Sequence, residues 1–98
     1  MEIIKNSDGA NMEISLIGRL DTTTAPQLEA EVKASIDGVE KLVFDFKDLE
    51  YVSSAGLRVI LATQKIMNRQ GSMEIKNVSD DIMEVFDITG FSDILTIV

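Results

Sequence analysis

Apolar residues fall into short blocks along the chain, and their spacing alternates between the period of a strand and that of a helix. Residues 2–6 and 12–18 are predicted to be strands, because Met12, Ile14 and Leu16 alternate with polar residues. The intervening residues 7–11 contain Asp-Gly, a strong hairpin signal, although five residues indicate more than the tightest turn. The N-terminal region is therefore expected to form an antiparallel hairpin with one buried face.

The next block predicts an amphipathic helix. Apolar residues recur at helical spacing from Ala25 to Ile36. Thr24 is expected to cap this helix, with Gln27 three residues later at the spacing of a capping box. Pro26 falls in the first turn, where its missing N–H has no helical partner to lose.

Five further elements are expected, in chain order: a strand at 41–46, a helix at about 54–69, a strand at 73–76, a helix from Ser79 to Gly90, and a strand at 94–98. Consecutive apolar residues in the segment KLVFDF suggest a central strand that is covered on both faces. This order predicts an α/β fold in one domain spanning residues 1–98. Its sheet is mixed and mostly parallel, with about five strands, an antiparallel N-terminal hairpin and three helices. The pattern leaves open whether the helices cover one face or both.

The net charge of the chain argues against some classes of binding partner. Nine Lys and Arg stand against seventeen Asp and Glu, for a formal charge of -8, so nucleic acid and anionic membranes are both disfavoured. A basic protein partner, or one that tolerates an acidic surface, is expected instead. No apolar run approaches the length of a membrane span, so membrane insertion is not expected, and residues 1–5 do not resemble a signal peptide. A cytoplasmic location is expected.

The segment 48-DLEYVSSAGLRVIL-61 holds the main candidate for chemistry. A serine at a strand-to-helix turn is typical of a nucleophile elbow, but the window 52–56 lacks the first glycine of G-x-S-x-G. The chain contains no histidine and no cysteine, which removes the commonest general base, a cysteine nucleophile and thiolate metal sites. The chain contains neither of the glycine motifs that bind nucleotide phosphates, G-x-x-x-x-G-K-[ST] and G-x-G-x-x-G. Asp45, Asp48 and Glu50 are close in sequence, but on a strand and a turn they need not converge on a metal. We therefore expect no enzymatic activity and no cofactor.

Two interpretations of the serine pair remain open on physical grounds. Either Ser53 or Ser54 caps the following helix and has no other role. Alternatively, one serine caps and the other presents an accessible hydroxyl that can be phosphorylated, because the helix dipole and free amides stabilise the added charge.

At this point the residues resemble a known family. Four segments carry the resemblance: Gly-Arg-Leu-Asp at 18–21, Val-Phe-Asp at 43–45, the whole of 48–61, and Phe-Asp-Ile-Thr-Gly-Phe at 86–91. The chain resembles the STAS domain, specifically the single-domain anti-sigma factor antagonists of bacteria. The resemblance implies that an anti-sigma factor, which is also a serine kinase, binds the protein and releases its sigma factor. Phosphorylation by this kinase would end the interaction, and a serine phosphatase would restore it.

The family pattern D-S-[SA]-G-L assigns the phosphate acceptor to Ser54, with Ser53 as a rival because it replaces the usual aspartate. The resemblance also implies a partner-binding surface made of Asp21, Thr22, Ser53, Ser54, Ala55, Gly56, Leu57 and Arg58. The alternative function is a STAS scaffold that is never phosphorylated and serves a larger assembly, such as a lipid transporter or a signalling complex.

Overall fold

The computed structural model describes all residues from Met1 to Val98. Its elements, in chain order, are β1 (Glu2–Asp8), β2 (Asn11–Leu20), α1 (Ala25–Ser35), β3 (Lys41–Asp45), β4 (Leu49–Val52), α2 (Ser54–Gln70), β5 (Ser72–Lys76), α3 (Asp80–Thr89) and the short 3-10 helix η1 (Phe91–Asp93). The sheet runs in the order β1-β2-β3-β5, and β4 pairs separately with β2. Only the β1–β2 pair is antiparallel. The predicted fold class, a mixed five-stranded sheet with an N-terminal hairpin and three helices, is confirmed.

The hairpin is tighter than its sequence suggested. Strand pairing continues to Asp8 opposite Asn11, so only two residues form the turn. Gly9 adopts φ 62°, a conformation that a glycine accepts without strain. Residues that were expected to form a five-residue loop are instead the ends of two longer strands.

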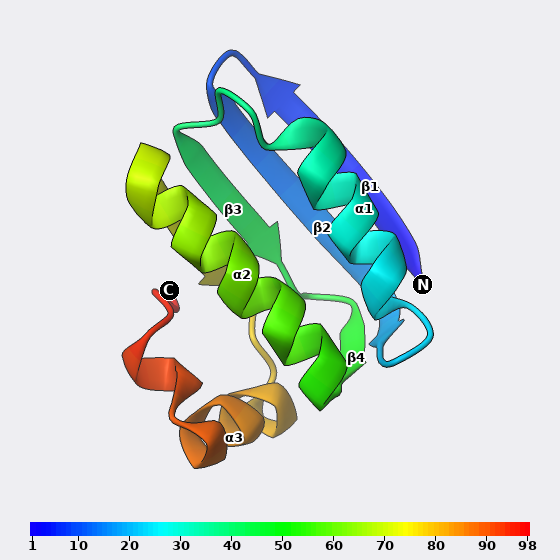
Figure 1. Ribbon diagram of the computed structural model, residues 1–98. Helices are drawn as coiled ribbons and strands as arrows, with labels where there is room; N and C mark the ends of the chain where they lie inside the picture. The colour runs from blue at the N-terminus through cyan, green and yellow to red at the C-terminus, as the bar shows by residue number, and fades with distance from the viewer.

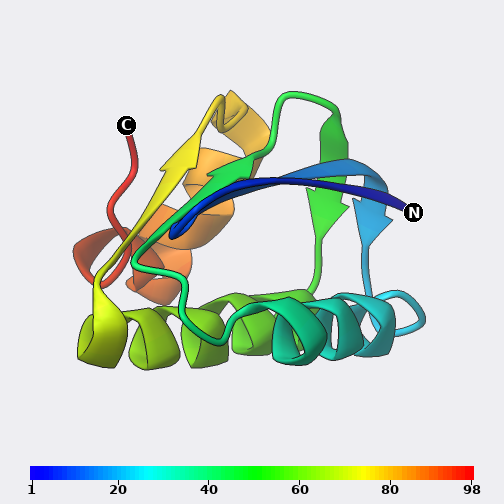
Figure 2. The same ribbon diagram turned by 90° about the horizontal axis from the view of Figure 1, so that it is seen from above.

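The core lies between one face of the sheet and the α1–α2 layer. Figure 2 shows these two helices in one layer beneath the sheet. The alternating residues Met12, Ile14 and Leu16 of β2 are buried in the core. In Figure 1, α3 lies beyond the carboxyl end of β3. There the ring of Phe86 meets that of Phe46, with 6.4 Å between centroids. Only α1 and α2 therefore form the layer on the core side, whereas α3 lies outside that layer, at the level of the strands (Figure 2).

The opposite face of the sheet is not covered, which corrects one expectation. β3 is central, but Val43 on its outer face is half-exposed. Polar groups occupy the same face, where Lys76 lies 2.9 Å from Glu13 and Lys41 lies 3.6 Å from Glu74. The consecutive apolar residues of β3 therefore do not mark a strand that is buried on both sides.

The predicted last strand, 94–98, is wrong. Residues after α3 form η1 and then make a single parallel bridge, between Ile75 and Ile97. The chain turns at Leu95, whose amide donates to the carbonyl of Phe91 at 2.8 Å, so a helical turn replaces the start of a strand. The fifth strand is β4, which lies between the expected strand at 41–46 and the expected helix at about 54–69, where no element was predicted.

No helix in the structure combines the length and apolar character that crossing a membrane would require.

Candidate partner-binding site

The residues predicted for partner binding meet at one end of the molecule. The end of β2 and the loop 21–24 lie beside the end of β4 and the first turn of α2 (Figure 1). A backbone hydrogen bond joins the two chain segments, from the amide of Ser53 to the carbonyl of Leu20 at 2.8 Å. Two stretches that lie far apart in sequence therefore form one surface.

Ser53 caps α2. Its backbone is extended, with φ -97° and ψ 174°, and its Oγ accepts a hydrogen bond from the amide of Gly56 at 3.4 Å. This is the arrangement of an N-cap serine, which satisfies one of the amides left free at a helix start. The side chain is half-buried, so its hydroxyl is committed to the fold.

Ser54 is the first residue of α2 and is exposed. Its hydroxyl makes no hydrogen bond in the structure, in contrast to that of Ser53. The first turn of α2 contains no acidic residue, so the positive end of the helix dipole has no anionic side chain nearby in sequence. One turn further on, Arg58 is also exposed.

The glycine two residues after Ser54 is explained by packing. A Cβ placed on Gly56 would lie 2.6 Å from Cγ of Leu20 and 3.1 Å from its carbonyl oxygen. The start of α2 therefore rests directly on the end of β2, and only glycine fits there. Leu57 is 5% exposed and points into the core, whereas Ala55 is half-buried. Of the predicted set, Gly56 and Leu57 thus hold the surface in place and do not themselves form it.

The loop 21–24 is built around the carboxylate of Asp21. Its Oδ1 accepts from the Thr23 amide at 3.0 Å, from the Thr23 hydroxyl at 2.8 Å and from the Thr24 amide at 3.2 Å. The hydrogen bond from the Thr23 side chain, aided by those from the backbone amides, lowers the pKa of Asp21. Asp21 is therefore an ionised side chain whose hydrogen bonds are made within the loop 21–24. The neighbouring Thr22 is exposed.

The predicted capping box of α1 is wrong. Thr24 stands at the cap position but has helical backbone angles, and its side chain caps no amide of the helix. Its hydroxyl instead accepts from the amide of Asp21 at 2.8 Å and donates to the carbonyl of Arg19 at 2.8 Å. Gln27 reaches the carbonyl of Met1 at 3.4 Å, so it closes no reciprocal bond. The Thr24 side chain therefore stabilises the loop 21–24 and does not cap α1.

Two surface residues at this end were not predicted. Arg19 of β2 pairs in register with Tyr51 of β4, and its guanidinium lies 4.3 Å from the centroid of the Tyr51 ring. Tyr51 is 42% exposed, among the few large apolar side chains at the surface. Exposed tyrosine and arginine are typical of protein interfaces. Both residues occur in the segments that carry the family resemblance, but their contact depends on β4, which was not predicted.

An open depression of about 410 Å³ adjoins the start of α2 and separates it from α1. It is lined by Thr22, Ala25, Pro26, Glu29, Ala55, Arg58, Val59 and Ala62. Thr22, Ala55 and Arg58 therefore face a common hollow, which links the loop 21–24 to the solvent side of α2.

No group of three or more acidic side chains is arranged to hold a metal ion. Asp45 instead accepts from the Lys47 amide at 2.9 Å and from the Asn77 side chain at 3.0 Å. Burial by itself would raise the pKa of Asp45, but these hydrogen bonds and the charges of Lys76 and Lys47 outweigh it and lower the pKa.

The chain is similar to known proteins over nearly its whole length. The family model of the STAS domain matches residues 2–98. BtrV of Bordetella bronchiseptica is 39% identical over 84 residues, which cover 84% of this chain and 72% of BtrV. The anti-sigma-B factor antagonist of Bacillus subtilis is 32% identical over 88 residues, or 89% of this chain and 81% of that protein.

Solved structures share the fold at lower identity. The unphosphorylated form of the anti-sigma factor antagonist SpoIIAA superposes with a TM-score of 0.79 at 20% identity, covering 99% of this chain and 87% of SpoIIAA. The phosphorylated form of the Bacillus cell fate determinant SpoIIAA gives a TM-score of 0.77 at 20% identity, covering 99% of this chain and 91% of that one.

Proposed function

Because the chain belongs to the STAS domain family, we propose that it is an anti-sigma factor antagonist that is controlled by phosphorylation of Ser54. In this role it binds an anti-sigma factor that is also a serine kinase, and the sigma factor is released. Phosphate on Ser54 ends the interaction, and a serine phosphatase restores it. The protein acts by binding and has no catalysis of its own, in keeping with the names of relatives such as the anti-sigma-B factor antagonist of Bacillus subtilis.

The division of labour between the two serines carries the proposal. Ser53 is half-buried and its Oγ is occupied by the amide of Gly56, whereas the hydroxyl of Ser54 is exposed and unbonded. An attacking hydroxyl must be reachable, so Ser54 is the better acceptor. The Ser54 side chain makes no hydrogen bond that phosphorylation would break.

A phosphate on Ser54 is compatible with the fold. It adds a charge of about -1.5 to -2 at the first position of a helix, where anions are favoured by about 0.3–1 kcal/mol. The fold should therefore survive, and the effect falls on the partner. Repulsion and lost packing amounting to about 3–4 kcal/mol would weaken binding several hundredfold. SpoIIAA, which shares this fold, is known in unphosphorylated and phosphorylated forms.

The surface around Ser54 supplies further contacts for the same partner. Asp21 accepts hydrogen bonds from Thr23 and Thr24. Arg19 lies 3.9 Å from the Asp21 carboxylate and stacks on the ring of Tyr51. A net charge of -8 fits a protein partner in the cytoplasm better than nucleic acid or a membrane.

The test is phosphorylation by the anti-sigma factor kinase encoded in the same genome. The protein is incubated with kinase and ATP, and the modified residue is mapped by mass spectrometry. We expect phosphate on Ser54, none on Ser54→Ala, and normal modification of Ser53→Ala. Ser79→Ala is the matched control, because Ser79 is also an N-cap serine, bonded to the amide of Ile82 at 3.3 Å. Undiminished phosphorylation of Ser54→Ala would overturn the assignment.

The alternative, a STAS scaffold within a larger assembly, predicts a different outcome. In that role no kinase modifies the protein, and Ser54→Asp binds its partner as well as the wild type does.

A further inference from the structure

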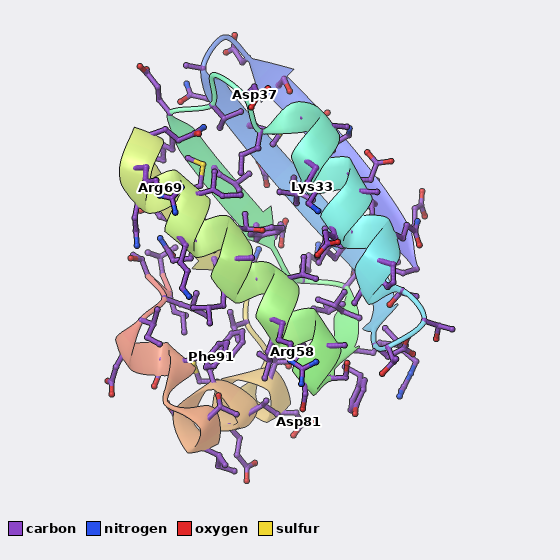
Figure 3. The ribbon with its side chains drawn as sticks, viewed as in Figure 1. Lys33, Asp37, Arg58, Arg69, Asp81 and Phe91 are labelled. Atoms are coloured by element: carbon purple, nitrogen blue, oxygen red, sulfur yellow. The ribbon has the colours of Figure 1, made fainter.

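The solvent face of α2 differs in charge from the rest of the molecule. The helix contains three of the nine cations of the chain, Arg58, Lys65 and Arg69, and none of its seventeen acidic residues. All three cations are exposed. Figure 3 shows Arg58 near the start of the helix and Arg69 near its end. We call these three residues the α2 cation stripe.

The spacing of the stripe places its members in line. Positions 58, 65 and 69 are seven and four residues apart, which corresponds to nearly whole turns of an α-helix. Their side chains therefore emerge within about 40° of one another, over about 16 Å of the helix axis. Ser54 stands on the same line, one turn before Arg58.

These cations have no carboxylate partner. Five of the other six cations lie within 4.0 Å of an acidic side chain, namely Lys5, Arg19, Lys33, Lys41 and Lys76. No such pair is formed by Arg58, Lys65 or Arg69, although acidic residues outnumber basic ones almost two to one. The stripe is thus an unneutralised positive surface on an acidic protein.

We propose that the α2 cation stripe is a docking surface for an acidic segment of a protein partner, which lies along α2 with one end at Ser54. Complementary charge selects an acidic partner and accelerates its encounter. Ala55, Val59 and Ala62 line the α2 side of the depression beside the stripe and offer that segment apolar contacts, whereas Glu29 lines the α1 side. A nucleic acid fits less well, since the remaining surface is strongly acidic and would repel its backbone.

The stripe also suggests how the switch operates, and this part rests on the proposed function. A phosphate on Ser54 would stand at the head of the stripe, four residues before Arg58, at the spacing of an i,i+4 ion pair. The phosphate would neutralise Arg58 from within the same helix and repel the acidic segment. Phosphorylation would then act by competing for a cation of the docking surface.

A titration with a defined probe tests the docking surface. The 15N-labelled protein is titrated with a helical peptide that carries glutamates at spacings of seven and four residues, and with its glutamine counterpart. We expect amide shifts in α2 with the glutamate peptide only, and weaker binding at 300 mM than at 50 mM salt. Reversal of one charge, as in Arg58→Glu, should lower the affinity about two- to tenfold.

Lys47→Glu is the control, because Lys47 is an exposed cation that lies outside the stripe and has no acidic partner within 4.0 Å. It should bind the glutamate peptide like the wild type. Equal binding of the glutamine peptide, shifts outside α2, or unchanged binding after reversal of all three stripe residues would overturn the proposal. So would tighter binding of a single-stranded oligonucleotide than of the glutamate peptide.

The same titration on protein phosphorylated at Ser54 separates the two proposals. If the kinase modifies no residue, the proposed function fails, but the peptide still tests the stripe. If phosphorylation succeeds and the glutamate peptide binds equally well before and after it, competition for Arg58 is wrong and the proposed function stands.

Discussion

Gly56 rests directly on Leu20: a Cβ at position 56 would lie 2.6 Å from Cγ of Leu20, a side chain with no exposed surface. This contact sets how closely the first turn of α2 approaches the end of β2. It also explains why position 56, two residues after Ser54, is a glycine.

The Gly56→Ala variant should be less stable than the wild type. Alanine favours a helix over glycine by about 1 kcal/mol, but overpacking against Leu20 costs about 1–3 kcal/mol, so the clash should prevail. Chemical denaturation measures the difference. In a Leu20→Ala background the space is open, and the same Gly56→Ala change should become neutral or stabilising. A loss of equal size in both backgrounds would show that the two residues are not coupled.

Substitution of Ser53 should lower the free energy of unfolding more than substitution of Ser54. Ser53→Ala removes the cap of α2 and should lower the free energy of unfolding by about 0.5–1 kcal/mol, near the lower end for caps because the hydrogen bond is long at 3.4 Å. Ser54→Ala should stay within about 0.5 kcal/mol of the wild type, as is usual for surface positions. Urea denaturation of both variants at neutral pH provides the comparison, and the reverse order would reassign the cap.

Because the pKa of Asp45 is lowered in the folded protein, we expect the stability of the protein to depend on pH. Burial opposes the charged form of this side chain, yet the Asn77 and Lys47 hydrogen bonds and the nearby lysine charges lower its pKa. A folded pKa below the unfolded value stabilises the protein above about pH 4. That contribution is lost as the pH falls through the lowered folded pKa.

Asp45→Asn should therefore be less stable than the wild type at pH 7, by less than about 1 kcal/mol for a half-exposed group, and the difference should shrink towards pH 3. Unfolding free energies across this range measure the effect. Asp48→Asn is the matched control, because Asp48 is exposed and its carboxylate makes no hydrogen bond in the structure. A difference that grows in acid would contradict the sign.

Tyr51 should matter for binding more than for folding. Tyr51→Ala removes an exposed ring whose contact with Arg19 is worth about 0.5–1 kcal/mol. Tyrosine is enriched among interface hot spots, whose truncation costs about 2 kcal/mol or more, so we expect affinity for the anti-sigma factor to fall at least tenfold. Calorimetry with the purified anti-sigma factor gives the affinity. Ile88→Ala, at a residue that is 77% exposed and lies on α3, serves as the control.

The elements with strong periodicity were predictable. The alternation around Ile14 and the long amphipathic run of α2 each have a local signature, and each is found where it was expected. A serine cap at the start of α2 was also expected, but the local sequence left open whether Ser53 or Ser54 supplies it, and the structure shows that it is Ser53. The hairpin turn was misjudged because Ser7 and Asn11 are polar residues within paired strands. Polar side chains are common at exposed strand ends, where pairing and not composition defines the element.

The elements that depend on distant contacts were not predictable. β4 has only four residues, and Glu50 and Tyr51 are both exposed between two buried ones, so no alternation marks it. Its pairing follows an irregularity between Gly18 and Arg19, which the local sequence does not reveal. The site residues were found by their motif, but the Arg19–Tyr51 contact exists only once β2 and β4 are side by side.

The hydrogen bond between the Ser53 amide and the Leu20 carbonyl has a consequence for recognition. It fastens the serine turn to a strand that lies far away in the sequence, so the shape of the turn depends on the folded chain. A linear peptide with the sequence of residues 48–61 lacks Leu20 and cannot reproduce it. Any enzyme or partner that binds this turn must therefore recognise a surface that exists only in the folded protein. Short peptides that contain the serine turn should be poor substrates for such an enzyme and poor competitors for such a partner.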